Sequence, residues 1–120
     1  MQLQIHAKDF SLTDALRKHV VSRLHFDLAR FQPAVRKVEV HLSDVNGPRG
    51  GLDKRCQVRV RLASHSDVVI EDTEADLYHA VDRAVGRSAR TVSRRLERAR
   101  RKARMPDRGA SQAMQDPDPA

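Results

Sequence analysis

The sequence is poor in cysteine, in aromatic residues and in long hydrophobic runs. Its 120 residues include one cysteine, no tryptophan and four other aromatic side chains. A single cysteine, Cys56, excludes an intramolecular disulfide framework, and its place in an alternating apolar pattern predicts a small core residue. No apolar run approaches the roughly 20 residues that cross a bilayer, and the N-terminus lacks the hydrophobic stretch of a signal peptide. These absences predict a cytoplasmic protein without a membrane partner.

The motifs that carry common enzyme chemistry are missing as well. The six histidines show no His-Glu-x-x-His spacing and lie beside no cysteine pair, so we expect no metal site. The glycine-rich stretch 46–53 (NGPRGGLD) lacks the Gly-Lys-Ser/Thr of a nucleotide-binding loop. Tyr78 and Asp82 lie one helical turn apart, which predicts only a hydrogen bond that steadies the helix. We therefore expect no enzyme, no cofactor and no small-molecule substrate.

Charge is plentiful and strongly biased. The chain holds 23 basic and 16 acidic residues, a net charge of +7, and residues 1–104 alone hold 22 and 13, a net charge of +9. A small body with this excess usually faces a polyanion, with nucleic acid the commonest and an anionic membrane surface the main rival. Residues 105–120 contain three prolines and no apolar periodicity. We predict one folded domain at 1–104 and a disordered tail at 105–120.

The hydrophobic periodicity predicts an α+β fold in the order β-α-β-β-β-α. Alternating apolar residues predict strands at 2–6, 35–45, 54–64 and 67–73. Apolar residues three or four apart predict helices at 13–30 and 74–104, the first capped by Ser11 or Thr13 and the second by Thr73 with Asp76. A sheet with one apolar face and two amphipathic helices predicts a two-layer sandwich, with both helices on the same face.

The strongest functional signal is the arginine pattern of the second helix. Between residues 83 and 104 there are ten basic side chains and one acidic side chain, whereas ordinary solvated helices mix both signs. At 100° per residue, six of these arginines fall on the face opposite the apolar stripe. Guanidinium groups suit phosphate oxygens, so we expect this face to bind RNA, with the last two turns projecting from the body. The six are Arg83, Arg87, Arg90, Arg94, Arg98 and Arg101.

A weaker set of basic residues lies elsewhere. Lys54 and Arg55 begin the third strand, Arg49 lies in the glycine-rich loop, and Lys18 projects from the first helix. None of the four aromatic rings is expected on the polar sheet face, which argues against a platform on which bases of a single strand would stack. Recognition of backbone phosphates and 2′-hydroxyls is the mode that remains.

Three stretches of the sequence carry a likeness to a known family, and they are MQLQIHAKDFSLTDALRKHVVSRL, DVNGPRGGLDKRCQVRV and EDTEADLYHAVDRAVGR. Their most specific parts are the Thr-Asp-Ala-Leu and Asp-Leu-Tyr-x-Ala-Val-Asp helix starts. Over about residues 1–100 the chain resembles the ribosome hibernation-promoting factor and ribosome-associated inhibitor family, also called sigma-54 modulation protein.

The resemblance implies a fold similar to double-stranded-RNA-binding domains and a non-enzymatic inhibitor of translation. Members of the family bind the small ribosomal subunit between head and body, cover the sites of messenger RNA and transfer RNA, and silence translation under stress or in stationary phase. By position, the family's RNA-facing helix surface falls on Arg83, Arg87, Arg90 and Arg94. Long members carry a second, dimerising domain, which we do not expect here.

Two alternatives stay open at this point. One is a protein-interaction regulator that modulates transcription, as the older family name indicates. The other is a general binder of duplex RNA or DNA.

Overall fold

The computed structural model describes residues 1–44 and 53–104, and these residues form an α+β sandwich. The predicted order β-α-β-β-β-α is confirmed, with one short 3-10 turn (η1) added after the first helix. The elements are β1 (Gln2–Lys8), α1 (Asp14–Leu28), η1 (Ala29–Phe31), β2 (Val35–Asp44), β3 (Lys54–Leu62), β4 (Val68–Glu74) and α2 (Leu77–Arg104).

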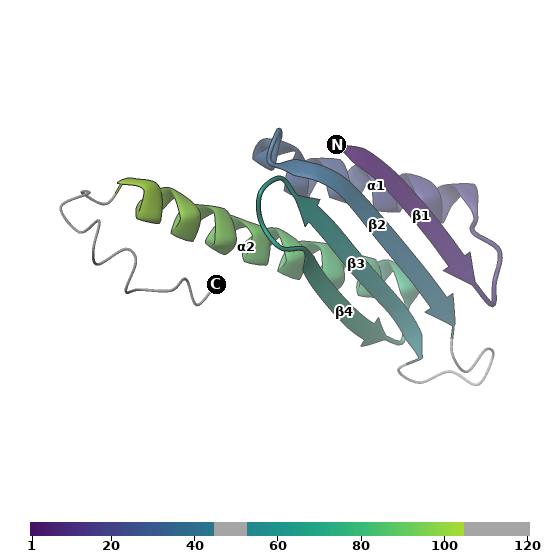
Figure 1. The fold of residues 1–120 in the computed structure, drawn as a ribbon. Coiled ribbons are helices and arrows are strands. Elements are labelled where there is room, and N and C mark those ends of the chain that lie inside the picture. The colour runs from purple at the N-terminus through teal and green to yellow at the C-terminus, as the bar shows by residue number, and fades with distance from the viewer. Residues whose placement is uncertain (45–52, 105–120) are drawn as a thin grey trace.

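The four strands form one mixed sheet in the order β1-β2-β3-β4. β1 runs parallel to β2, as a connection through α1 requires, and the other neighbours are antiparallel. Figure 1 shows both helices on the same face of this sheet, as predicted. The opposite face is therefore left to solvent.

The core lies between the sheet and the helices. Leu16, Val20, Leu24 and Leu28 repeat every four residues along α1 and are buried. They pack with the inward residues of β2 and β3 and with the apolar stripe of α2, in which Val81, Val85 and Val92 have no exposed surface. Burying each such side chain contributes roughly 1.5–3 kcal/mol, so this cluster holds α2 in one rotational setting. That setting decides which arginines face outward.

Several predicted boundaries change in the structure. α1 ends at Leu28 rather than residue 30, β3 ends at Leu62 rather than residue 64, and β4 spans Val68–Glu74 rather than 67–73. α1 begins after Thr13, whose Oγ1 accepts a hydrogen bond from the Leu16 amide at 3.1 Å, so Thr13 and not Ser11 is the cap. β1 continues to Lys8, because Ala7 and Lys8 pair with β2. α2 begins at Leu77 rather than residue 74, because residues up to Glu74 pair with β3. Pairing with β3 therefore determines the start of α2, and the local capping signal at Thr73 does not.

The last turns of α2 extend past the sheet, as predicted. Figure 1 shows the helix continuing beyond the strands on one side of the molecule. After Leu96 the side chains from Arg100 to Lys102 are exposed. The predicted connection at 46–53, apart from Asp53, and the predicted tail at 105–120 lie outside the described residues.

Candidate nucleic-acid interface

α2 presents all six predicted arginines to solvent. Val81, Val85 and Val92 face the core, so residues on the opposite side of the helix point outward. The exposed six are Arg83, Arg87, Arg90, Arg94, Arg98 and Arg101.

The first two arginines of this row are paired with the edge of the sheet. Arg83 Nε lies 3.0 Å from Glu74 Oε2 and 3.4 Å from Asp72 Oδ2. Arg87 Nη1 lies 3.1 Å from the same Asp72 oxygen and donates to the Glu71 carbonyl at 3.2 Å. We call Arg83 and Arg87 the proximal pair. Their charge is largely compensated by β4.

Asp72 is the centre of these contacts. Only 9 % of its side chain is exposed. Burial favours the neutral acid, but the hydrogen bond from Arg87 and the positive charges of Arg83 and Arg87 outweigh it and lower the pKa of Asp72 below its ordinary value. The carboxylate therefore stays ionised and fixes the proximal pair against the body.

The other four arginines have no carboxylate partner within residues 1–44 and 53–104. Arg94 makes one long hydrogen bond, 3.4 Å, to the Thr91 hydroxyl of its own helix. Glu97 lines the same hollow as Arg94, Arg98 and Arg101, but its carboxylate pairs with Arg100 at 3.2 Å. We call Arg90, Arg94, Arg98 and Arg101 the distal row. Because none of its members forms an ion pair with a carboxylate of the described residues, this row is the part of α2 best suited to an external polyanion.

Arg95 is a functional candidate that the sequence analysis did not select. It borders the apolar stripe on the helical wheel, so periodicity alone assigns it to the rim of the core. The structure instead directs its Nη1 to the β3–β4 connection, where it donates to the carbonyls of Ser66 and Asp67 at 2.9 and 3.0 Å. Only the tertiary contact reveals this position.

The basic side chains on the open sheet face are mostly neutralised. Glu39 lies between three basic side chains, 3.5 Å from Lys37, 3.7 Å from Arg61 and 3.9 Å from Arg59. Arg55 lies 3.7 Å from Glu71. These ion pairs, most of them between neighbouring strands, stabilise the sheet and weaken the attraction of its open face for phosphate.

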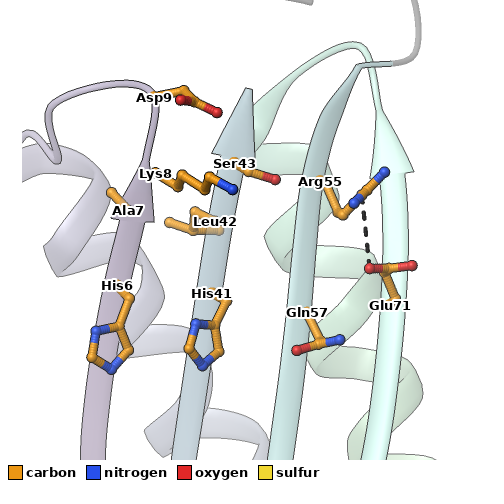
Figure 2. A pocket seen from close by; sticks show the side chains of 10 residues that line it. All are labelled: His6, Ala7, Lys8, Asp9, His41, Leu42, Ser43, Arg55, Gln57 and Glu71. Atoms are coloured by element: carbon orange, nitrogen blue, oxygen red, sulfur yellow. Dashed lines mark ion pairs between the residues drawn. The ribbon is translucent and has the colours of Figure 1, made fainter. Parts of the chain in front are cut away.

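A shallow hollow remains at one end of this face (Figure 2). Its volume is about 420 Å³, and the imidazoles of His6 and His41 lie nearly parallel across β1 and β2, with ring centroids 4.7 Å apart. Figure 2 also shows Lys8 and Gln57 around it, and the ion pair between Arg55 and Glu71. The hollow thus combines basic, amide and acidic groups and has no uniform charge.

The remaining predicted residues do not join one surface. Lys54 Nζ lies 2.9 Å from Asp53 Oδ1 and 3.2 Å from Asp44 Oδ1, and the hydrogen bond that it donates to Asp53 raises the pKa of Lys54 despite some desolvation. Lys18 is exposed on α1. Arg49 lies outside the described residues. The structure therefore assembles the α2 arginines, and it places Lys54 in an internal ion pair.

The predicted hydrogen bond between Tyr78 and Asp82 is wrong. Asp82 Oδ1 is instead 2.7 Å from His19 Nε2 and 3.4 Å from Arg23 Nε, both on α1. The ring of Tyr78 packs against the His19 ring, with centroids 4.9 Å apart. Because His19 and Arg23 of α1 face Asp82, its carboxylate connects α2 to α1 and does not bond to a residue one turn away on its own helix.

The described part of the chain gives little support for a cysteine nucleophile, a metal site or a membrane-spanning helix. Cys56 is buried, and burial together with the nearby Asp72 charge raises the pKa of its thiol to about 12, the opposite of an activated nucleophile. Within residues 1–44 and 53–104, no three His, Cys, Asp or Glu side chains are grouped so that they could hold a metal ion. Among the described helices, none has the length and apolar character needed to cross a membrane.

Two solved structures resemble the chain closely in fold. The first is the N-terminal domain of Protein Y from Thermus thermophilus, at 32% sequence identity and a TM-score of 0.66, covering 78% of this chain and 98% of that one. The second is a ribosomal subunit interface protein from Coxiella burnetii, at 21% identity and a TM-score of 0.66, covering 81% and 99%. At this lower identity the second comparison supports the fold alone. No curated protein matches the chain.

A family model gives the most extensive match. The model described as Sigma 54 modulation protein / S30EA ribosomal protein matches residues 3–100, almost the whole described domain. This confirms the resemblance drawn from the sequence, and it agrees with the expectation of a protein that is not an enzyme, since the family consists of ribosome-associated modulators. The chain belongs to the Sigma 54 modulation protein / S30EA ribosomal protein family.

Proposed function

We propose that the chain is a ribosome-associated inhibitor of translation that acts by occupancy. It binds ribosomal RNA of the small subunit, in the cleft that messenger RNA and transfer RNA use, and it excludes both during stress or stationary phase. Its place of action is the cytoplasm, where ribosomes work. The proposal rests on membership of a ribosome-associated family and on the charge of α2.

The single observation that carries the RNA contact is the distal row. Four arginines project from one helix, which Val85 and Val92 fix in the core, and none of the four forms an ion pair with a carboxylate of the described domain. An arginine fork forms two parallel hydrogen bonds to phosphate oxygens, and its position is set by the helix before the RNA arrives. Phosphate would relieve the repulsion that the row otherwise carries.

The aromatic side chains support backbone recognition over base stacking. Phe26 and Tyr78, the most exposed of them, lie on the helices and not on the open sheet face. Stacking platforms for single strands need such rings on the sheet surface. Contacts to phosphate and to 2′-hydroxyls are therefore the favoured mode, consistent with binding to folded ribosomal RNA.

Cosedimentation with separated ribosomal subunits tests the proposal. We expect the protein to pellet with the small subunit and to be displaced by bound initiator transfer RNA. If about six phosphates are neutralised, the logarithm of the binding constant should fall with the logarithm of salt concentration with a slope of about −4 to −5. A slope near zero, or a nuclease-resistant complex with polymerase or a sigma factor in place of ribosomes, contradicts the proposal.

A further inference from the structure

A basic hollow lies beside α2, on a different flank from most of the distal row. Its volume is about 510 Å³, and its lining comes from the β3–β4 connection and from α2. Figure 1 shows this connection beside α2, where the helix leaves the sheet. We call it the hairpin notch. Its lining residues are Ser64, His65, Ser66, Arg95, Arg98, Ala99, Lys102 and Ala103.

Arg95 is fixed in this notch before any ligand binds. One nitrogen, Nη1, donates to the carbonyls of Ser66 and Asp67 at 2.9 and 3.0 Å and lies 3.4 Å from the Ser66 hydroxyl. A guanidinium has five N–H donors in a rigid plane, so the contacts made by Nη1 leave those on Nε and Nη2 for another acceptor. Anchoring one side of the fork removes much of the entropy loss that an arginine suffers on binding.

The notch has the composition of an anion site. Its lining holds two arginines, a lysine, a histidine and two serine hydroxyls, and no Asp or Glu. Two acids are adjacent in sequence to lining residues. Asp67 directs its carboxylate to Arg59 at 3.2 Å and offers only its carbonyl to Arg95, and Glu97 pairs with Arg100 at 3.2 Å. Ser64 adopts a left-handed backbone conformation, with φ 67°, at the turn that brings these hydroxyls beside the helix. The charge inside the notch is therefore positive.

Arg98 connects this notch to the distal row. It also borders a second hollow of about 310 Å³ on the neighbouring flank, together with Arg94 and Arg101. Glu97 lines this second hollow as well, and its carboxylate pairs with Arg100. The two hollows thus lie on either side of the projecting turns of α2. A helix with phosphate-binding groups on two flanks can contact two stretches of RNA backbone at once.

We propose that the hairpin notch is a second phosphate site, which takes the RNA backbone while the distal row holds another stretch of it. This inference rests on the proposed function, since it assumes that the polyanion is RNA. In it, Arg95 and Lys102 bind phosphate oxygens, and the Ser64 and Ser66 hydroxyls donate to phosphate or 2′-hydroxyl oxygens. The projecting turns of α2 then lie between two backbone segments, and the β3–β4 connection belongs to the interface.

Nuclear magnetic resonance of the full chain tests the site without a ribosome. Arginine Nε–H signals would be followed during separate titrations with an A-form RNA duplex, inorganic phosphate and an acidic peptide. We expect the duplex to shift Arg95 together with the Ser66 amide, and phosphate to shift the same signals at higher concentration. Lys102→Gln should weaken duplex binding about 5-fold and flatten the salt slope by about 1. The control Arg100→Gln removes equal charge nearby, outside the notch, and should change neither.

Each of the following outcomes overturns the proposal that the hairpin notch binds RNA phosphate. If the duplex shifts Arg94 and Arg101 but not Arg95, the notch is not an RNA site, while the proposed function stands. If only inorganic phosphate or only the acidic peptide shifts Arg95, the ligand is not RNA. Equal losses in Lys102→Gln and Arg100→Gln show a general charge effect. Because Arg95 also fastens the β3–β4 connection, Lys102→Gln is the decisive variant, and its affinity is compared with the wild type under conditions where both unfolding curves show a fully folded protein.

Discussion

The proximal pair and the distal row consist of the same residue on the same face of one helix, and they differ only in what lies opposite. Arg83 and Arg87 meet Asp72 and Glu74 of β4, at 3.0–3.4 Å. The distal row begins one turn later, where the edge strand no longer supplies carboxylates. An arginine near the sheet therefore stabilises the fold, and an arginine beyond it is available to a ligand. The spacing along α2 places all six arginines on one face of the helix, so the difference between the proximal pair and the distal row comes from tertiary structure.

The largest effect should follow from reversing charge in the distal row. Arg94→Glu, Arg98→Glu and Arg101→Glu together should weaken binding to the small subunit about 100-fold or more, because three charge-assisted contacts of roughly 1 kcal/mol each are lost. The melting temperature should change little, since these side chains are exposed and have no carboxylate partner in the described domain. Cosedimentation and thermal unfolding measure the two effects. Unchanged affinity would remove the distal row from the interface.

The proximal pair should show the opposite pattern. Arg83→Gln with Arg87→Gln leaves the largely buried carboxylate of Asp72 without its cations, which should lower the free energy of unfolding by about 1–2 kcal/mol. Affinity for the small subunit should fall less than about 3-fold. Urea unfolding measures the loss, and adding Asp72→Asn to the double variant should restore part of it. A large loss of affinity with unchanged stability would show that the proximal pair faces RNA after all.

The acid limb of stability should report the same carboxylate. The pKa of Asp72 is lowered in the folded state, so its contribution is fully present above its unfolded pKa of about 3.9 and is lost as pH falls through the lower folded value. Wild type should therefore lose stability below about pH 4 more steeply than Asp72→Asn. Urea unfolding at pH values from about 3 to about 7 measures the difference. Parallel curves would mean that Asp72 is not stabilised by its arginines.

The smallest effect should come from Arg100. It lies on the projecting turns but pairs with Glu97 at 3.2 Å, with both side chains largely exposed. Arg100→Gln should change the free energy of unfolding by less than about 0.5 kcal/mol and affinity by less than about 2-fold. If this variant binds as weakly as a distal-row variant, net charge rather than position controls binding.

Most of the fold follows from periodicity. Leu16 to Leu28 at intervals of four, and the alternation around Val58 and Val60, are local patterns, and the structure buries these residues. The start of α2 could not be predicted locally. Thr73 reads as a cap, yet it pairs with Arg55 of β3, 18 positions away in the sequence. Long-range sheet pairing decides such boundaries.

The candidate site is less predictable than the fold. The outward direction of the arginines followed from the helical wheel, because the apolar stripe fixes the helix. Their partners did not, since Asp72 and Glu71 reach Arg87 from another element. Arg95 was missed for the same reason, because its hydrogen bonds join residues 28 and 29 positions apart. Charge pattern thus predicts where cations gather, and only tertiary contacts show which of them are neutralised.

Salt dependence of small-subunit binding, measured for two matched double variants, tests the division of α2 most directly. Arg83→Gln with Arg87→Gln and Arg94→Gln with Arg101→Gln each remove two charges from the same face. The distal variant should flatten the slope of log binding constant against log salt by about 1.5, and the proximal variant by less than about 0.5. Equal flattening, or a larger effect from the proximal variant, would contradict the account.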